Sequence, residues 1–392
     1  MIEASQSTSG FSRIRLGMVG GGQGAFIGAV HRMAARLDDR FELMAAAPSS
    51  DPARAHASGA EMRLDPARVY ADFRAMAVAE AARADGVQMV VIVTPNHLHH
   101  PVACAFLDAG IDVICDKPLT RTVAEAEDLA ARVQQGQRLF AVTYTYSGYP
   151  MVRHAREMVA AGALGDIRVV QVEYPQDWLV NDLESTGQKQ AGWRTDPALS
   201  GDGGCIGDIG THAFQMARFV TGLAVKELAA DLTSFVPGRR VDDDVQVRLR
   251  FANGARGQLW ASQVATGCQN GLMLRVFGTQ GGLVFRQELP EELWFTPLGE
   301  APRRLTRGGP GAGVAAAHAT RVPGGHPEGY LEAFAQLYRD AADQFEARRD
   351  GLPIPTASQS LTDIAVGVEG MRFIDTAIRS HRAGGNWVPF SA

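Results

Sequence analysis

The chain of 392 residues is long enough for two domains, since single hydrophobic cores rarely grow beyond about 250–300 residues. Its formal net charge is -5 and charged residues make up 21%, which argues against a basic nucleic-acid-binding surface and against an acidic solvating block. Its four scattered cysteines lack the paired spacing of a metal site and the density of a disulfide scaffold, so we expect buried thiols, a reducing compartment and no metal.

The first residues, 1–12, are polar and are expected to form a disordered tail. They lack the charged region and apolar core of a secretory signal, and no run of about 18 apolar residues follows anywhere in the chain. We therefore expect a cytoplasmic protein whose partners are small molecules, without nucleic-acid or membrane binding.

Residues 13–146 alternate short β-rich apolar runs with amphipathic stretches, a pattern typical of a parallel sheet covered by helices. The predicted strands are 13–20, 41–49, 88–95, 111–118 and 138–146, and the predicted helices are 25–37, 72–83, 99–109 and 122–135. This range is predicted to form a doubly wound α/β domain.

Residues 147–392 have a different pattern, with long alternating segments joined by Asn-Gly and Gly-Gly pairs that indicate antiparallel strands. Helices are predicted at 150–161, 328–349 and 358–382, and the Gly- and Pro-rich segment 306–327 is predicted to be a loop. We expect an α+β domain with a large, open, mostly antiparallel sheet.

A glycine turn follows the first predicted strand and precedes a helix. Gly20 would permit the tight turn, Gly22 the close approach of a pyrophosphate, and Ala25 replaces the third glycine of the dinucleotide-binding pattern. The helix after it would direct free N–H groups at the phosphates. A simple turn is the alternative, since the chain has 43 glycines, but the strand-turn-helix order favours a dinucleotide.

The choice between NAD and NADP depends on the end of the second strand. Ser49 and Ser50 stand where an acidic residue usually binds the ribose hydroxyl, and Asp51 and Arg54 follow slightly later. The missing acid removes one barrier to NADP without creating a strong phosphate site, so the sequence gives a weak preference for NAD.

Polar residues follow two further strands, at the edge where ligands bind in open parallel sheets. Among them is Lys117, one of only three lysines in the chain, in the segment "CDKPLT". A solvated loop position in this chain would more readily carry arginine, whereas a compact ammonium that points outward before Pro118 suits contact with a substrate oxygen.

Asp208 and His212 lie four residues apart in "GDGGCIGDIGTHAF", on one face of a predicted helix. Such a pair alone is more often a surface pair than a site. The four glycines around it lower helix stability by about 1 kcal/mol each, which indicates that this segment must approach another group closely.

These segments resemble the Gfo/Idh/MocA family of nicotinamide-dependent dehydrogenases across nearly the whole chain. The family's E-K-P element corresponds to residues 116–118 and its D-x-G-x-H element to residues 208–212. Within the family the resemblance is closest to the levoglucosan dehydrogenase-like sugar dehydrogenases. Three departures are Asp116 in place of Glu, Gln215 in place of a frequent second Asp, and Ser49-Ser50 in place of an Asp-Arg pair.

The resemblance implies an N-terminal Rossmann domain, a C-terminal sheet that builds homodimers or homotetramers, and a catalytic set of Lys117, Asp208 and His212. The residues then expected at the cofactor are Gly20, Gly22, Gln23, Gly24, Phe26, Ile27, Ser49, Ser50, Arg54, Thr94, Pro95, Asn96, His99, Asp116, Lys117, Trp193 and Arg194. Those expected at the substrate are Lys117, Tyr146, Gln176, Asp208, His212 and His326, although packing is an equal alternative for Tyr146, Gln176 and His326 and for Trp193 and Arg194.

The predicted reaction is oxidation of a secondary hydroxyl of a sugar, anhydrosugar or related polyol to a ketone, with hydride transfer to NAD(P). His212 would act as the base, Lys117 would stabilise charge on the reacting oxygen, and Asp208 would orient the substrate or the imidazole. An NAD-assisted glycoside hydrolase and a non-catalytic sugar sensor are the alternatives.

Overall fold

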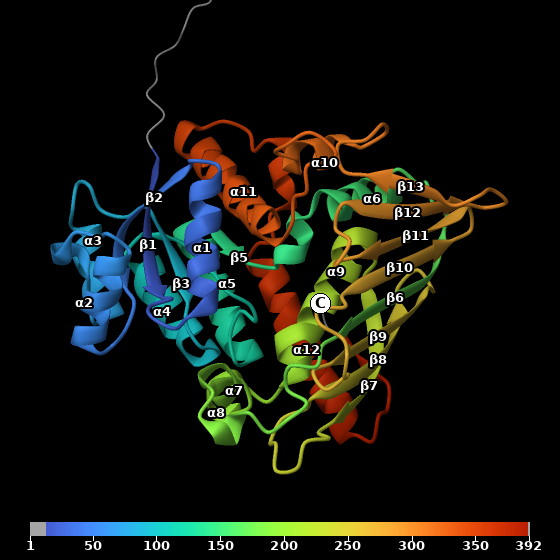
Figure 1. Ribbon diagram of the computed structural model, residues 1–392, viewed down its shortest axis with the longest axis horizontal. Coiled ribbons are helices and arrows are strands. Elements are labelled where there is room, and N and C mark those ends of the chain that lie inside the picture. Colours follow the sequence, from blue (N-terminus) through green and yellow to red (C-terminus); the bar gives the residue numbers. More distant parts are fainter. Residues whose placement is uncertain (1–12, 391–392) are drawn as a thin grey trace, which may run out of the picture.

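The computed structural model describes residues 13–390, so the predicted tail at 1–12 lies outside the described residues. A smaller parallel sheet with helices on both sides lies on the left in Figure 1, and a larger sheet closes the molecule on the right. Helices fill the space between the two sheets. The predicted fold class, a Rossmann-type α/β sheet followed by α+β structure with an open sheet, is confirmed.

The smaller sheet has five parallel strands in the order β2-β1-β3-β4-β5. They are β1 (Ile14–Gly20), β2 (Phe41–Ala47), β3 (Met89–Val93), β4 (Asp112–Cys115) and β5 (Phe140–Val142). Every residue of β3 is buried, as expected for a central strand covered on both faces. A single parallel bridge from Ala46 to Val69 continues the pairing beyond β2. The strand order reverses at β1, because β2 is added on one side of it and β3 on the other, and this switch point opens a crevice at the carboxyl ends of β1 and β3.

Five helices connect these strands: α1 (Phe26–Leu37), α2 (Pro52–Glu61), α3 (Phe73–Ala81), α4 (His99–Asp108) and α5 (Val123–Gly136). Three of them begin at residues whose side chains accept hydrogen bonds from the first turn, namely Asp51, Asp72 and Thr122. The four predicted helices agree with α1, α3, α4 and α5 to within two residues at each end. The helix α2, which begins at Pro52, was not predicted.

The larger sheet has nine strands in the order β13-β12-β11-β10-β6-β9-β8-β7-β14. They are β6 (Ile167–Pro175), β7 (Val225–Thr233), β8 (Asp244–Phe251), β9 (Arg256–Ser262), β10 (Met273–Gly278), β11 (Gly281–Arg286), β12 (Glu292–Pro297), β13 (Arg303–Thr306) and β14 (Val388–Pro389). Only β6 and β9 pair in parallel. Asn253-Gly254 joins β8 to β9 as predicted, whereas Thr279-Gln280 form the β10–β11 turn and the Gly281-Gly282 pair lies inside β11.

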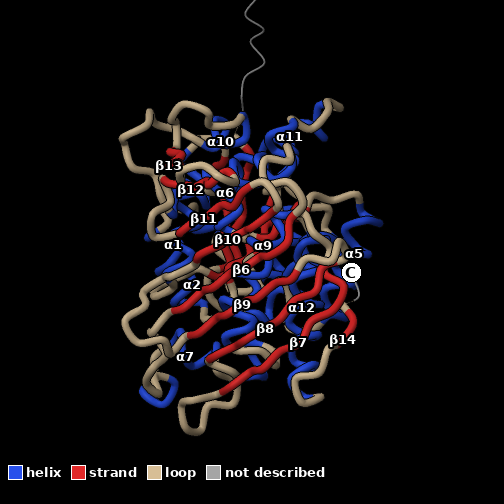
Figure 2. The backbone as a smooth tube through the Cα atoms, turned by 90° about the vertical axis from the view of Figure 1, so that its right-hand side faces the viewer, coloured by secondary structure: helices blue, strands red, loops and turns tan. Residues whose placement is uncertain are grey.

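One face of the larger sheet is covered and the other is open. The covering helices are α6 (Pro150–Ala160), α9 (Thr211–Thr221) and α12 (Ile364–Arg382), which contact its strands. Figure 2 shows the uncovered face, with the strands in front and the helices behind. The remaining elements are α7 (Lys189–Arg194), α8 (Pro197–Ser200), α10 (Val314–Ala319), α11 (Tyr330–Asp350), a π-helix at Ile206–Gly210, and 3-10 turns at Pro66–Arg68, Asn96–Leu98, Thr145–Gly148, Glu184–Thr186 and Thr356–Ser360.

Two sequence expectations for the C-terminal part are wrong. The segment 306–327 contains the helix α10 because its alanine-rich centre packs with Ala316 and Ala319 fully buried. The last helix begins at Ile364 and not at residue 358, since Asp363 caps it after a 3-10 turn.

The C-terminal helix α11 packs on the first sheet. Phe334 and Tyr338 belong to the same buried cluster as Leu16, Val30 and Phe41, so α11 completes the apolar core beside α1. The helix α12 likewise packs against α5. Among residues 13–390, no helix is long and apolar enough to cross a membrane.

Candidate active site

Lys117 and Asp208 form an ion pair between the two halves of the molecule. Lys117 follows β4 by two residues, and its Nζ lies 3.0 Å from Oδ1 of Asp208 in the π-helix. Both side chains are less than one-fifth exposed, at 16% and 18%. The sequence-predicted sheet edge and the predicted Asp-His segment therefore meet. The Lys117–Pro118 peptide bond is cis.

The π-helix begins against the loop before β8. Asp242 accepts hydrogen bonds from the backbone N–H groups of Gly204 and Ile206, each at 2.7 Å. A Cβ on Gly204 would lie 2.2 Å from the carbonyl oxygen of Asp242, so only glycine allows this approach. The expected α-helix around Asp208 is thus replaced by one wider turn, a geometry that often accompanies functional sites.

The carboxylate of Asp208 is surrounded by cations and amides. Its Oδ2 accepts a hydrogen bond from Nε2 of Gln263 at 2.8 Å and lies 3.4 Å from Nε of Arg194. Burial raises the pKa of Asp208, but the charges of Lys117 and Arg194 outweigh burial and hold that pKa well below its usual range. Asp208 is therefore ionised at neutral pH, with its oxygens occupied by Lys117 and Gln263.

His212 lies in the first turn of α9 and is only 7% exposed. Its Nδ1 has no hydrogen-bond partner among the described residues. The ring is held edge-on by aromatic rings, with centroids 4.8 Å away for Tyr146 and 5.7 Å away for Tyr144. Burial, and then the charge of Lys117, lower the pKa of His212 well below its usual value, so the imidazole is neutral and able to accept a proton.

A hydrogen-bonded polar cluster borders the His212 ring. Tyr146 and Tyr174 share a hydrogen bond through their hydroxyls, and Tyr174 donates to Oδ1 of Asn270 at 2.6 Å. The amide of Gln176 donates to the same Asn270 oxygen at 2.8 Å. Two predicted substrate residues, Tyr146 and Gln176, therefore belong to one network beside the candidate base.

The crevice between β1 and β3 has the features of a pyrophosphate site. Cβ atoms on Gly20 and Gly22 would lie 2.7 Å from the Val93 carbonyl oxygen and 2.8 Å from the Pro48 carbonyl oxygen. The helix α1 has no side-chain cap at Ala25 and no acidic residue in its first turn, which leaves its N–H groups and positive dipole end available. These residues fit a dinucleotide.

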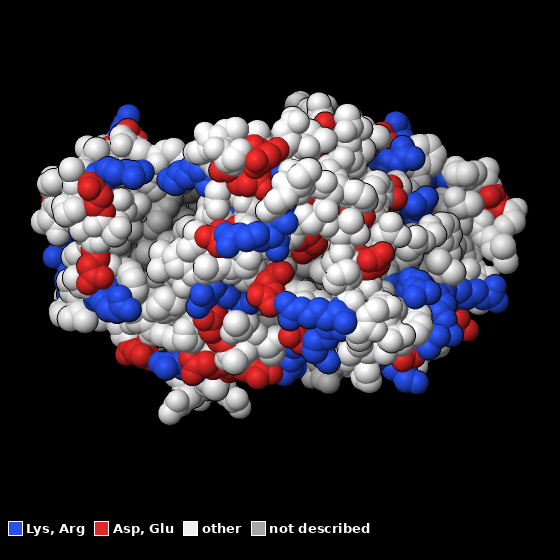
Figure 3. Space-filling view, turned by 90° about the horizontal axis from the view of Figure 1, so that it is seen from below, with Lys and Arg blue, Asp and Glu red and all other residues white. Residues whose placement is uncertain are grey.

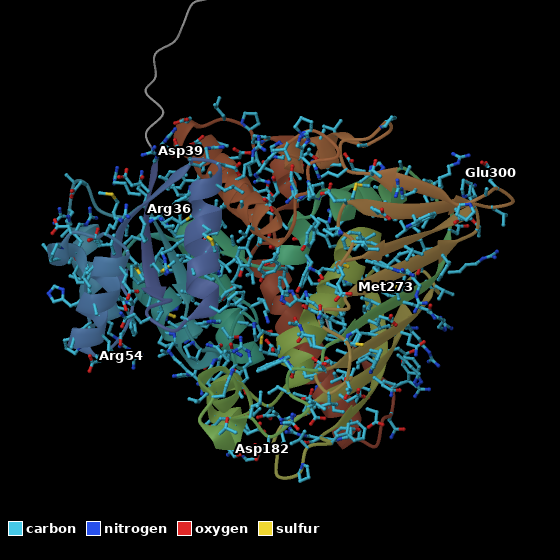
Figure 4. The ribbon with its side chains drawn as sticks, viewed as in Figure 1. Arg36, Asp39, Arg54, Asp182, Met273 and Glu300 are labelled. Atoms are coloured by element: carbon cyan, nitrogen blue, oxygen red, sulfur yellow. The ribbon has the colours of Figure 1, made fainter. Side chains whose placement is uncertain are left out.

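Other predicted cofactor residues lie around this crevice. Figure 4 shows Arg54 on α2 at the lower side of the molecule, the side to which the carboxyl end of β1 also points. The carboxylate of Asp51 accepts a hydrogen bond from the backbone N–H of Arg54, so it caps and stabilises the start of α2. The remaining members are exposed or half-buried loop and helix-end residues, namely Gln23, Gly24, Phe26, Ile27, Ser49 and Ser50.

The predicted residues at the edge of β3 have two different environments. The hydroxyl of Thr94 is buried without a hydrogen-bond partner among the described residues, and Pro95 beside it is half-buried. His99, in contrast, is 1% exposed, and its ring nitrogens lie 2.9 Å from the carbonyl oxygens of Thr94 and Pro118. Asn96 donates to the carbonyl of Ser200 at 2.9 Å. His99 and Asn96 therefore stabilise the backbone at the carboxyl end of β3 through hydrogen bonds to buried carbonyl groups.

Asp116 forms its side-chain hydrogen bonds with interior residues. Its Oδ1 accepts a hydrogen bond from Thr143 at 2.6 Å and lies 3.2 Å from Nε2 of the buried His31. The other ring nitrogen of His31 lies 2.7 Å from the hydroxyl of Tyr338 in α11. Burial raises the pKa of Asp116, but His31 and Thr143 outweigh burial and lower it to about 2. The residue before Lys117 is thus fixed as a carboxylate.

Arg194 connects α7 to the site. Its guanidinium carbon lies 4.2 Å from the centroid of the Trp193 ring and 6.0 Å from that of Trp178. A cleft between the two halves is lined by Asn96, Pro118, Trp193, Arg194, Gly207, Asp208 and Gln263, among others. Figure 3, seen from below, shows a hollow to the left of the centre and interspersed acidic and basic residues on that face.

Among residues 13–390, no hydrogen bond, ion pair or aromatic contact joins His326 to the other predicted substrate residues. It is exposed in the loop between α10 and α11, and its Nδ1 lies 3.2 Å from the carbonyl oxygen of Pro323. Gln215, at the position of the family's frequent second Asp, is 4% exposed and its Oε1 has no partner among the same residues.

Comparison with known proteins agrees with this geometry. Residues 14–144 match the model of an oxidoreductase family with an NAD-binding Rossmann fold, and residues 152–284 match a GFO/IDH/MocA C-terminal domain. An oxidoreductase structure from Sinorhizobium meliloti is 51% identical, with a TM-score of 0.87 over 96% of this chain and 99% of that one. The chain belongs to the Gfo/Idh/MocA family. It is therefore an oxidoreductase with an NAD-binding Rossmann domain, of the sugar or polyol dehydrogenase type.

Two further relatives of this Gfo/Idh/MocA oxidoreductase have names that include a substrate. An inositol dehydrogenase homolog from Azotobacter vinelandii, in complex with NADH and myo-inositol, is 35% identical with a TM-score of 0.89 over 97% of this chain and 98% of that one. The levoglucosan dehydrogenase of Pseudarthrobacter phenanthrenivorans is 30% identical over 319 residues, which are 71% of this chain and 75% of the relative. The family resemblance predicted from the sequence motifs is confirmed.

Several residues of the site were not predicted from the Gfo/Idh/MocA motifs. Gln263 and Asn270 lie far along the chain in strand-end segments whose sequence carries no distinctive signal. Gly28 could have been found, because it lies three residues after Ala25, in the first turn of the helix that follows the glycine turn. A Cβ there would lie 2.4 Å from the Cα of Gly21, so Gly28 packs against the turn. His31, one turn later, could not be paired with Asp116 without the fold.

Proposed function

We propose that the protein oxidises a secondary hydroxyl of a sugar, anhydrosugar or cyclic polyol to a ketone. The observation that carries this proposal is the meeting of a buried neutral imidazole, His212, with the Lys117–Asp208 ion pair at the edge of a dinucleotide crevice. The relatives whose names include myo-inositol or levoglucosan support the substrate class. Bound NAD supplies the hydride acceptor.

His212 is proposed to remove the hydroxyl proton. Its pKa is lowered by burial and by Lys117, which keeps the ring unprotonated at neutral pH. The orientation of the ring comes from Tyr144 and Tyr146, since no hydrogen bond connects it to the carboxylate of Asp208 among the described residues. The tyrosines thus take the orienting role that the sequence suggested for Asp208.

Lys117 is proposed to stabilise negative charge that develops on the reacting oxygen. Its ammonium has three donors and is held by Oδ1 and the backbone oxygen of Asp208, which leaves one N–H direction free. Gln263 and Arg194 hold the other oxygen of Asp208. Asp208 therefore acts mainly as the group that positions the ammonium.

The substrate is proposed to lie between Lys117, His212 and the Tyr146–Gln176 network, because hydroxyl and amide groups there can exchange hydrogen bonds with a polyol. Among the predicted substrate residues, His326 is proposed only as an exposed loop residue that could approach a bound substrate. NAD is proposed as the preferred cofactor over NADP, since Ser49 and Ser50 offer no cation to a 2'-phosphate.

We also propose that the chain forms a homodimer or homotetramer through the open face of the larger sheet. Val169, Phe277 and Trp294 project from the same face of neighbouring strands and are 37%, 39% and 42% exposed. A partner would remove these apolar side chains from water. Sedimentation of the wild type beside a Phe277→Glu, Trp294→Glu variant tests this, because an unchanged oligomer would exclude this face.

One panel tests the activity. Polyols, monosaccharides and anhydrosugars are incubated with NAD or NADP, and the reduced cofactor is followed by absorbance. Net reduction of NAD with one class of substrate is expected. Cleavage of a glycoside without net reduction would instead indicate the hydrolase, and binding without either reaction would indicate the sensor.

A further inference from the structure

A cluster of side chains that can ligate a metal lies away from the proposed catalytic residues, on the outside of the smaller sheet. His100 and Cys104 are four residues apart on α4, and Asp128 faces them from α5. His100 is 26% and Asp128 43% exposed, so a solvated ion has access. Within the described residues, this is the one group of three such side chains whose ligand atoms all lie within 4.8 Å of one another.

The three distances can be compared with those of a tetrahedral zinc site. Zinc lies about 2.3 Å from sulfur and about 2.0–2.2 Å from nitrogen or oxygen, so the ligand atoms around it are roughly 3.3–3.6 Å apart. Here Sγ of Cys104 lies 3.5 Å from Nε2 of His100 and 3.7 Å from Oδ2 of Asp128. The remaining edge, His100 Nε2 to Asp128 Oδ2, is 2.8 Å and would open by about 0.5 Å.

A plain ion-pair cluster explains only part of this arrangement. Arg132 donates to Oδ2 of Asp128 at 2.9 Å and also contacts Asp108, so Asp128 is satisfied by His100 and Arg132 without a thiol. The thiol of Cys104 nevertheless points at the same two atoms. Arg132 opposes a cation by its charge, but carboxylates that bind a metal are themselves hydrogen-bonded, and Arg132 supplies such a hydrogen bond to Asp128.

We propose that His100, Cys104 and Asp128 bind a thiophilic divalent cation, Zn²⁺, with water as the fourth ligand. The thiol proton passes to solvent as the sulfur–metal bond forms. Two ligands at positions i and i+4 of one helix and a third from the next helix clamp α4 to α5. Because α4 begins at His99, whose ring contacts the carbonyls of Thr94 and Pro118, the clamp reinforces the edge that carries Lys117.

No motif in the sequence indicated this site, and the proposal departs from the expectation that no metal binds. His100 and Cys104 share a helical face, but the third ligand lies 24 residues further on, and the pattern contains no paired cysteines. Only the packing of α5 on α4 brings the carboxylate to them.

The experiment uses the full chain stripped of metal by a chelator. Co²⁺, which replaces Zn²⁺ and absorbs light, is titrated in while the thiolate-to-cobalt charge-transfer band is recorded, and Zn²⁺ is then added to displace it. One equivalent of Co²⁺ per chain with a sulfur band that Zn²⁺ removes is expected. Absence of the band at stoichiometric Co²⁺ would overturn the proposal, and this result needs no variant.

Two pairs of variants locate the site. Cys104→Ser and Asp128→Asn should each weaken Zn²⁺ binding by at least about 100-fold, while Cys268→Ser, at the other half-buried cysteine, should bind as the wild type does. Arg132→Gln should bind more tightly, since it removes the opposing charge. A band that survives Cys104→Ser, or one that Cys268→Ser abolishes, would refute the assignment.

Discussion

Two glycine-rich segments of this oxidoreductase do different work with the same residue type. In residues 20–28, glycines let the turn after β1 lie against the ends of the neighbouring strands, because Cβ atoms at Gly20 and Gly22 would lie 2.7 Å from the carbonyl oxygen of Val93 and 2.8 Å from that of Pro48. In residues 201–210, glycine also permits a close approach, since a Cβ at Gly204 would lie 2.2 Å from the carbonyl oxygen of Asp242. The first segment acts through its backbone N–H groups, which can bind a cofactor. The second segment positions the side chains of Asp208 and His212.

This difference explains how the two segments contribute to one site. The first presents N–H groups at the start of α1, where no side chain competes for them. The second fixes a π-turn by three hydrogen bonds to Asp242, which places Asp208 against Lys117 and His212 among the tyrosines. Changes in the first should therefore alter cofactor binding, and changes in the second should alter turnover.

The largest effect is expected from His212→Ala. Loss of the proposed base should lower kcat by about 10²- to 10⁴-fold, with little change in the dissociation constant of NAD. His381→Ala, at an exposed position in the last turn of α12, should remain within about twofold of the wild type. Turnover that survives in His212→Ala would mean that another group accepts the proton.

The same residue gives a pH prediction. Burial and the Lys117 charge lower the pKa of His212 below its usual value, so the acid limb of kcat/KM should lie well below pH 6.5 in the wild type. An acid limb at or above pH 6.5 would contradict a buried neutral imidazole as the base.

The comparison of the segments is tested by Gly22→Ala and Gly204→Ala. A Cβ at Gly204 would lie 2.2 Å from the Asp242 oxygen and push the π-helix away, which should cost about 10²-fold in kcat and leave NAD affinity nearly unchanged. A Cβ at Gly22 should instead raise the KM for NAD. Gly192→Ala, where no atom lies within 4 Å of the added Cβ, is the matched control. Equal effects of the first two on both parameters would remove the distinction.

Asp242 should also make stability depend on pH. Burial raises its pKa from 3.8 to about 6, and a carboxyl whose folded pKa is raised contributes stability that is complete below pH 3.8 and is lost as the pH rises through about 6. Asp242→Asn should remove this dependence, so the free-energy difference between wild type and variant should change by about 1–3 kcal/mol between pH 4 and pH 7. Denaturant unfolding at both pH values measures it, and a constant difference would mean that Asp242 does not titrate in this range.

The sequence predicted local features of the site well and their mutual contacts poorly. The strand-turn-helix around Gly20 and the edge position of Lys117 follow from periodicity and turn chemistry over short ranges. The π-turn could not be predicted, because it depends on Asp242, more than 30 residues away. The packing of α11 on α1, with Tyr338 against His31, likewise depends on long-range contacts that no pattern within one element records.

The smallest expected effect concerns the far end of the cofactor crevice. Ser49→Asp restores a carboxylate that can accept from a ribose hydroxyl and repel a 2'-phosphate, so the ratio of kcat/KM for NAD to that for NADP should rise about tenfold, equivalent to roughly 1.4 kcal/mol. Ala60→Asp adds the same charge at the exposed far end of α2 and should leave the ratio unchanged. Since Ser49 follows Pro48, whose carbonyl oxygen lies close to Gly22, and is far from the π-turn in the chain, kcat with NAD should be unchanged. A fall in kcat without a change in the ratio would show that this end of the crevice influences the catalytic side chains, and that the two segments are not separable.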